Sequence, residues 1–172
     1  TFYFTLVAPS VPSVSTGDRA EAEAQLEGKS LLVVDDNATN RQILSRQAQN
    51  WQMQVRAAHS GAQALAWLQQ GESFDLAVLD MQMPHMDGLT LAAAIRQFPQ
   101  CQGLPLILFT SIGKPEGLRP DLDRLQFAAI LNKPIKQSQL YDAMLKAIDR
   151  PSFSPPLRQS TTSPPAARSV AP

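Results

Sequence analysis

The stretch FDLAVLDMQMPHMDG, residues 74–88, sets the pattern from which the fold can be worked out. Its first half holds a continuous apolar run, residues 76–79, that ends in a carboxylate at Asp80. Such a run is typical of a parallel strand covered on both faces. In its second half, Asp87 is suited to cap a helix and Gly88 to ease the turn into it. The stretch therefore predicts a buried strand that carries an acid to the edge of a sheet.

The same alternation of strand and helix continues on both sides of this stretch. Strands are predicted at 31–34, 54–59, 76–80, 106–110 and 128–131. Helices are predicted at 39–51, 62–70, 89–97 and 139–148, whereas Pro and Gly interrupt residues 114–126. Alternating strands and helices indicate an α/β fold, a doubly wound five-stranded parallel sheet with helices on both faces.

Composition separates this folded part, residues 28–150, from its flanks. The chain has 172 residues, of which 44% are hydrophobic, so it suits one domain with additional segments. Residues 10–27 have the composition of a linker, and the Pro- and Ser-rich residues 151–172 are predicted to be disordered or extended.

Charge and cysteine content exclude several classes of function. Lys+Arg and Asp+Glu both number 15, which gives no reason to expect contact with nucleic acid or an anionic membrane. No apolar run approaches the ~20 residues of a membrane helix. The single cysteine, Cys101, rules out an intramolecular disulfide and favours a reducing compartment; it is interpreted as an incidental thiol in a polar connection.

Polar side chains follow four of the predicted strands at their carboxyl ends. They are Asp35 and Asp36, Asp80, Thr110 and Lys133. Any one of these positions could simply mark where a strand stops. Together they lie at the edge where such sheets bind ligands. Two carboxylates ~4 Å apart repel each other by about 4 kcal/mol at an effective dielectric of ~20, so the cluster needs a compensating cation. Oxygen ligands without His or Cys favour a hard ion, and Mg²⁺ is the best match.

A magnesium ion, a lysine and a hydroxyl at one edge indicate phosphoryl chemistry, in which a carboxylate can be the nucleophile. The chain has no GxxxxGK[ST] and no GxGxxG motif to hold a nucleotide. His59 and His85 fall outside this set and are interpreted as surface or loop residues. Asn40 is interpreted as a local hydrogen-bonding residue, and Asn37 as a residue that orients the metal shell.

Four motifs occur in the order LLVVDDNATN, LAVLDMQMPHMDG, LILFTS and ILNKPI. With them the chain resembles the receiver domain of two-component response regulators over about residues 28–150. It looks most like receivers attached to hybrid sensor histidine kinases. The resemblance implies a flavodoxin-like sheet with the strand order 2-1-3-4-5.

The resemblance also implies a role for each site residue. Asp80 would be the phosphoacceptor, taking a phosphoryl group from the phosphohistidine of a kinase dimerisation domain or of a histidine phosphotransfer module. Asp35, Asp36, Asp80 and the backbone carbonyl of Gln82 would hold Mg²⁺. Thr110 would be the switch hydroxyl and Lys133 would contact the phosphoryl group.

Two further expectations concern the strand before Lys133 and the bond after it. Pro134 should follow a cis peptide bond. Ile130 stands where the family often has Tyr or Phe, so the inward swing of an aromatic ring is not expected here.

The first residues suggest what precedes the domain. TFYFTL, within residues 1–9, resembles the last strand of a histidine-kinase ATP-binding domain. The chain lacks an initiating Met and is interpreted as part of a longer sensor kinase, cytoplasmic or anchored in the inner membrane. Without the rest of the ATP site, this part is not expected to act as an ATP-dependent kinase or to touch the membrane.

Two other functions remain open from the sequence. One is a receiver-like interaction module that works without phosphorylation. Ile130, in place of the family's frequent Tyr or Phe, favours this alternative. The other is a hydrolase of small phosphate esters with an aspartyl nucleophile. Such enzymes tend to have a second acid two residues after the nucleophile, where this chain has Gln82.

Overall fold

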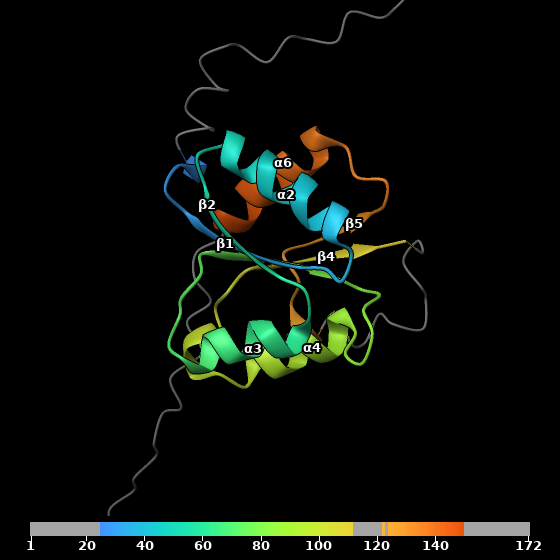
Figure 1. Ribbon diagram of the computed structural model, residues 1–172. Coiled ribbons are helices and arrows are strands. Elements are labelled where there is room, and N and C mark those ends of the chain that lie inside the picture. Colours follow the sequence, from blue (N-terminus) through green and yellow to red (C-terminus); the bar gives the residue numbers. More distant parts are fainter. Residues whose placement is uncertain (1–24, 112–121, 123, 150–172) are drawn as a thin grey trace, which may run out of the picture.

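The computed structural model describes residues 25–111, 122 and 124–149, which form a sheet between two layers of helices (Figure 1). The strands are β1 (Ser30–Val34), β2 (Gln54–Ala58), β3 (Leu76–Asp80), β4 (Leu106–Thr110) and β5 (Ala129–Asn132). The helices are α2 (Ala38–Asn50), α3 (Gly61–Gln69), α4 (Gly88–Arg96), the 3-10 helix η1 (Pro99–Cys101) and α6 (Gln137–Ile148).

All strand pairs are parallel, and the order across the sheet is β2-β1-β3-β4-β5. The predicted order and fold class are therefore confirmed. β1 occupies an inner place, and Val34 at its end is in register with Ala58 of β2 and Leu79 of β3. From β1 the chain adds β2 on one side and then β3 on the other, so the strand order reverses beside β1. The loops after β1 and β3 therefore lead to helices on opposite faces of the sheet.

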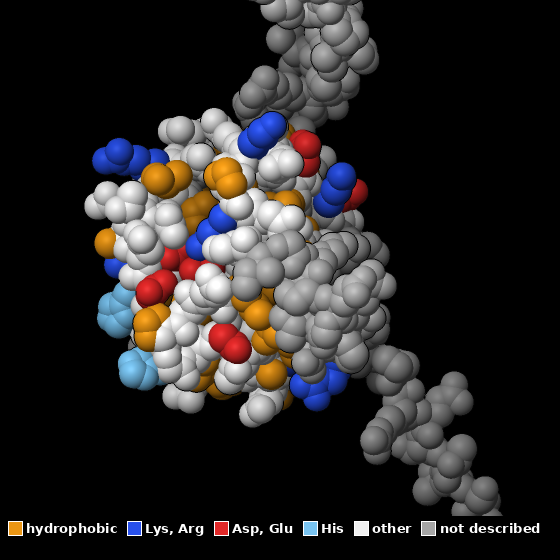
Figure 2. Space-filling model, turned by 90° about the vertical axis from the view of Figure 1, so that its right-hand side faces the viewer, with side chains coloured by type: hydrophobic (Ala, Val, Ile, Leu, Met, Phe, Trp, Pro, Cys, Tyr) orange, Lys and Arg blue, Asp and Glu red, His pale blue; other side chains and the backbone are white. Residues whose placement is uncertain are grey.

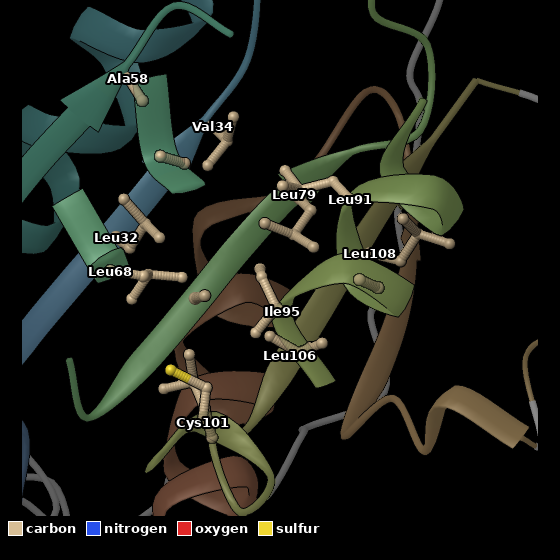
Figure 3. Close-up of a cluster of buried hydrophobic side chains, with 14 of the residues drawn as sticks. Leu32, Val34, Ala58, Leu68, Leu79, Leu91, Ile95, Cys101, Leu106 and Leu108 are labelled. Atoms are coloured by element: carbon tan, nitrogen blue, oxygen red, sulfur yellow. The ribbon is translucent and has the colours of Figure 1, made fainter. Parts of the chain in front are cut away.

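Two hydrophobic cores lie on the two faces of the sheet. Helices α3 and α4 cover one face and α2 and α6 the other (Figure 1). Leu32 and Leu79 point into the α3–α4 core, shown in Figure 3, whereas Leu31 and Val78 belong to the α2–α6 core. This alternation explains the continuous apolar runs at 31–34 in β1 and 76–79 in β3, since successive side chains are covered on one face or the other.

Cys101 differs from the sequence expectation. It was interpreted as lying in a polar connection, but its side chain is buried in the α3–α4 core. The 3-10 helix η1 turns this connection toward the face of the sheet that α3 and α4 cover. Burial raises the pKa of the Cys101 thiol, although the positive charge of Arg96 opposes this shift. The thiol therefore acts as a small apolar group.

Side chains outside the helices fix three of their beginnings. Asn37 accepts hydrogen bonds from the backbone N–H groups of Thr39 and Asn40 and so caps α2. Ser60 caps α3 in the same way. Asp87 accepts from the N–H of Thr90 at 2.7 Å, which confirms its predicted role at the start of α4.

Element bounds agree with the sequence predictions to within two residues, as expected for helix and strand ends. Leu26 is fully buried, so the packed unit reaches back into the segment interpreted as a linker. The predictions for residues 1–9 and 151–172, and most of those for 10–27 and 114–126, lie outside the described residues. No helix in the described part of the chain is long and apolar enough to cross a membrane.

Candidate functional site

Three carboxylates meet at the carboxyl ends of β1 and β3. The two strands are hydrogen-bonded neighbours in register, so Asp35, directly after β1, lies beside Asp80, the last residue of β3. Each of Asp35, Asp36 and Asp80 offers a carboxylate oxygen within 4.8 Å of the others. Asp35 is 1% exposed and Asp80 5%, whereas Asp36 is exposed. The sequence prediction that these acids converge therefore agrees with the geometry.

Lys133 lies between the two buried acids. Its Nζ is 2.9 Å from Oδ1 of Asp80 and 3.3 Å from Oδ2 of Asp35. The residue follows β5, and its backbone N–H donates to the carbonyl of Thr110 at the end of β4. The peptide bond that joins it to Pro134 is cis, as expected. The register of four neighbouring strands, β1, β3, β4 and β5, thus brings one ammonium to both acids.

Burial and charge act against each other in this group. Burial raises the pKa of the Asp80 carboxyl, and Lys133 opposes the rise without cancelling it. For Lys133, burial alone would lower the pKa, but the hydrogen bond to Asp80 and the charges of Asp35 and Asp80 raise it above its ordinary value. The lysine is therefore held as a cation next to the acid expected to be the nucleophile.

The first turn of α2 holds Asp35 from the other side. Oδ1 of Asp35 accepts from the backbone N–H of Asn37 at 2.8 Å. The side-chain amide of Asn40 donates to both carboxylate oxygens, at 3.3 and 3.1 Å. Nη1 of Arg41 donates to the backbone carbonyls of Asp35 and Asp36, each at 2.8 Å. The backbone and the carboxylate are therefore held by different side chains.

These contacts refine two sequence interpretations. Asn40 is a hydrogen-bonding residue, but its partner is the candidate metal ligand Asp35. The side chain of Asn37 caps α2, and only its backbone N–H reaches the acid. Arg41 was missed. The sequence did contain a signal for Arg41. Helix α2 starts two residues after Asp36, and side chains in the first turn of a helix tilt back toward its N-terminus, here toward the two acids.

The loop between β3 and α4 approaches Asp80 closely. The N–H of Gln82 points at Oδ1 of Asp80 at 3.4 Å, and the N–H of Gly88 donates to the carbonyl of Met81 at 3.1 Å. A Cβ at Gly88 would lie 2.6 Å from the Asp80 carbonyl oxygen and 2.8 Å from Cδ1 of Leu108. This close approach, rather than the turn alone, requires glycine at position 88.

The remaining candidate residues lie around this centre. Thr110 ends β4 and is 4% exposed. Ile130 is half-buried and packs against the α3–α4 core. His59 and His85 are exposed and do not belong to the acid cluster, as predicted.

A hollow of about 540 Å³ opens beside the buried acid and the lysine. Figure 2 looks at this side of the molecule and shows acidic side chains gathered next to a basic one, with apolar side chains nearby. Half of the lining residues are apolar, and Ile43, at 49%, is exposed more than any other large apolar side chain in the described ranges. The lining residues are Asp35, Asn40, Ile43, Leu44, Gln47, Phe109, Ser111, Lys133, Pro134 and Ile135.

The donor set fits a hard divalent cation. It consists of carboxylate oxygens only, two of them on buried residues and one on an exposed residue open to solvent. Mg²⁺ prefers such oxygen ligands and keeps several waters, which the exposed side of the cluster allows. With a cation and Lys133 present, the same edge could accept a phosphoryl group.

The chain matches the model of a known family. The family model described as the response regulator receiver domain matches residues 31–145 of this chain. The matched range spans the sheet from β1 to β5 and most of α6.

Several curated proteins are similar to this chain. The chain is 36% identical over 140 residues to the hybrid signal transduction histidine kinase L of Dictyostelium discoideum, covering 74% of this chain and 8% of that protein. It is 33% identical over 119 residues to the autoinducer 2 sensor kinase/phosphatase LuxQ of Vibrio vulnificus, covering 69% and 14%. It is 34% identical over 116 residues to the sensor protein TorS of Escherichia coli, covering 67% and 12%. The chain thus spans a small part of each relative.

Solved structures share the fold. The chemotaxis response regulator CheY4 of Vibrio cholerae matches with a TM-score of 0.64 and 28% identity, covering 70% of this chain and 98% of that one. The receiver domain of the sensor histidine kinase PA1611 of Pseudomonas aeruginosa matches with a TM-score of 0.63 and 23% identity, covering 70% and 98%. That second structure holds a magnesium ion in its active-site cleft, and at this identity the match supports the fold.

Proposed function

Since the chain belongs to the response regulator receiver domain family, we propose that it is the phosphoacceptor receiver of a hybrid sensor histidine kinase. In this proposal Asp80 takes a phosphoryl group from a phosphohistidine, either of a kinase dimerisation domain or of a histidine phosphotransfer module. The observation that carries the proposal is the position of Lys133, within 3.3 Å of both Asp35 and Asp80 at the carboxyl edge of the sheet.

The chemistry follows from the residues around Asp80. A carboxylate oxygen of Asp80 attacks phosphorus in line, the phosphorus–nitrogen bond breaks, and its electron pair leaves on the imidazole nitrogen of the donor. The product is an acyl phosphate on Asp80. Nζ of Lys133, 2.9 Å from Oδ1 of Asp80, would neutralise a phosphoryl oxygen, and this short distance supports that role. The hydroxyl of Thr110, at the end of the neighbouring strand, is the further donor in this proposal.

A divalent cation belongs to the same proposal. Asp35, Asp36 and Asp80, with the backbone carbonyl of Gln82, would hold Mg²⁺. When bound, the ion neutralises charge that develops on the phosphoryl oxygens. The oxygen-only donor set and its exposed side support this assignment.

The surroundings of the domain are also part of the proposal. Residues 1–9 are interpreted as the end of a kinase ATP-binding domain, 10–27 as a linker, 28–150 as the receiver and 151–172 as a second linker or tail. This part alone would not phosphorylate itself from ATP. The parent would be a cytoplasmic or inner-membrane-anchored sensor kinase that acts in a phosphorelay.

The test is intact mass after incubation with Mg²⁺ and acetyl phosphate. The unmodified chain should gain one phosphoryl group, EDTA should prevent the gain, and Asp80→Asn should show none. Asp142→Asn is the matched control, because Asp142 is an exposed carboxylate on α6. A phosphoryl group that persists on Asp80→Asn would refute the assignment of Asp80.

A second candidate is a receiver-like interaction module that needs no phosphorylation. The half-buried Ile130 favours it, since no aromatic ring is available there to report the state of Thr110. The two candidates differ in one result. If Mg²⁺ binds but neither acetyl phosphate nor a phosphorylated kinase modifies Asp80, the interaction module is the better description.

A further inference from the structure

We propose that Asn40 is a positioning residue that orients the Asp35 carboxylate toward the divalent cation. The idea rests on the proposed magnesium site and adds to it a residue that does not touch the ion. The side-chain amide of Asn40 donates to Oδ1 and Oδ2 of Asp35, at 3.3 and 3.1 Å.

The contact is specific to the carboxylate. Asn37 already caps α2, and Arg41 already holds the backbone carbonyls of Asp35 and Asp36. Neither the start of the helix nor the course of the loop therefore needs the Asn40 side chain. What Asn40 adds is the orientation of a carboxylate that is 1% exposed and thus beyond the reach of bulk water.

The residue type supports the same conclusion. Asparagine is a poorer helix former than alanine, because its side chain competes for backbone hydrogen bonds. Its presence in the first turn of α2 is therefore not explained by the helix, whereas the contact with Asp35 explains it. An amide also donates hydrogen bonds without bringing positive charge. A lysine or arginine in its place would repel the cation that the three acids attract.

Three donors make four hydrogen bonds to the carboxylate of Asp35, two to each oxygen. Oδ1 accepts from Asn37 and Asn40, and Oδ2 accepts from Asn40 and Lys133. Lys133 bridges to Asp80 and will respond to a phosphoryl group there. The side-chain amide of Asn40 donates to both oxygens of Asp35, so it can hold this carboxylate in one orientation while Lys133 changes partners.

Asn40→Ala tests the proposal, with Asn50→Ala as the matched control. Both residues lie in α2, and both changes favour the helix, but Asn50 is exposed at its far end. Loss of a hydrogen-bond partner of a metal ligand typically weakens metal binding 10- to 100-fold. We expect Asn40→Ala to weaken Mg²⁺ binding about 10-fold, measured by titration calorimetry and by amide shifts in NMR spectra of the full chain.

Phosphorylation kinetics distinguish a role of Asn40 in orienting Asp35 from a general loss of activity or folding. With acetyl phosphate, Asn40→Ala should raise the Mg²⁺ concentration for half-maximal rate by the same factor. It should leave the rate at saturating Mg²⁺ within about twofold of that of the unmodified chain and of Asn50→Ala. An unchanged Mg²⁺ affinity of Asn40→Ala would overturn the proposal. So would a fall in its rate at saturating Mg²⁺ as large as its loss of Mg²⁺ affinity. If the unmodified chain itself binds no Mg²⁺, the magnesium site fails, and the role of Asn40 fails with it.

Discussion

Replacing Lys133 with methionine should destabilise the domain, because it leaves two buried acids without their shared cation. Asp35 and Asp80 are 1% and 5% exposed, and the Nζ–oxygen distances are 3.3 and 2.9 Å. The formal charge of Asp35, Asp36, Asp80 and Lys133 is −2, from three acids and one base, and it becomes −3 in the variant.

The size of the effect can be worked from these distances. At an effective dielectric of ~20, charges 2.9 and 3.3 Å apart attract by about 5 to 6 kcal/mol each. The cost of dehydrating the ammonium offsets much of this sum, and breaking a buried ion pair costs about 3–5 kcal/mol in practice. The lysine side chain is 24% exposed, which favours the lower end. We expect a loss of about 3 kcal/mol, or roughly 10 °C in melting temperature.

Urea unfolding in the presence of EDTA measures this loss. Lys146→Met, which removes an exposed lysine from α6, should cost less than about 1 kcal/mol. Adding Asp80→Asn to Lys133→Met returns the cluster to −2 and should restore about half of the loss. Mg²⁺ should stabilise Lys133→Met more than the unmodified chain. A loss below about 1 kcal/mol, with equal responses to Mg²⁺, would refute the idea that Lys133 compensates the acids.

Three further substitutions test other parts of the structure. Gly88→Ala places a Cβ 2.6 Å from the Asp80 carbonyl oxygen and should cost about 1–3 kcal/mol in urea unfolding, with slower phosphorylation because Asp80 must shift. Arg96→Leu removes a half-buried guanidinium that donates to the carbonyls of Cys101, Leu104 and Leu125, and should cost about 3 kcal/mol in the same assay; a loss equal to that of the exposed Arg46→Leu would contradict this. Asp75→Asn should cost about 1 kcal/mol at pH 7 and almost nothing once the pH is below the folded-state pKa of Asp75. Burial alone would raise the pKa of Asp75, but hydrogen bonds from Ser30 and the charge of Lys29 lower it below the ordinary value of 3.8. Its stabilisation is therefore present above that value and is lost as the pH falls through the folded-state pKa; a loss that does not change with pH would contradict this.

Much of the site could be predicted because it depends on chain direction and on strand order. An acid at the carboxyl end of a parallel strand lies at the same sheet edge as every other such acid, so Asp35, Asp36 and Asp80 could be grouped from the sequence. The cap at Asp87 follows from local hydrogen bonding and was predicted for the same reason. The position of Lys133 required in addition that β5 be the neighbour of β4, which the resemblance supplied.

The contacts that could not be predicted depend on distances between segments far apart in the chain. The burial of Cys101 depends on a 3-10 turn that folds a polar connection under the sheet. Arg96 bonds to the carbonyl of Leu125, 29 residues away, and nothing in its own neighbourhood indicates that.

The amino-acid sequence by itself determined the alternation of strands and helices, the parallel sheet and the edge where the acids gather, since these follow from periodicity and chain direction. Only the tertiary structure decided that Asn40 faces Asp35, that Lys133 touches two acids at once and that position 88 has no room for a Cβ. The physical reason is that hydrogen bonds and close contacts change over a few tenths of an ångström. Such distances are set by the packing of α2, β3 and β5 against one another rather than by the order of residues within any of them.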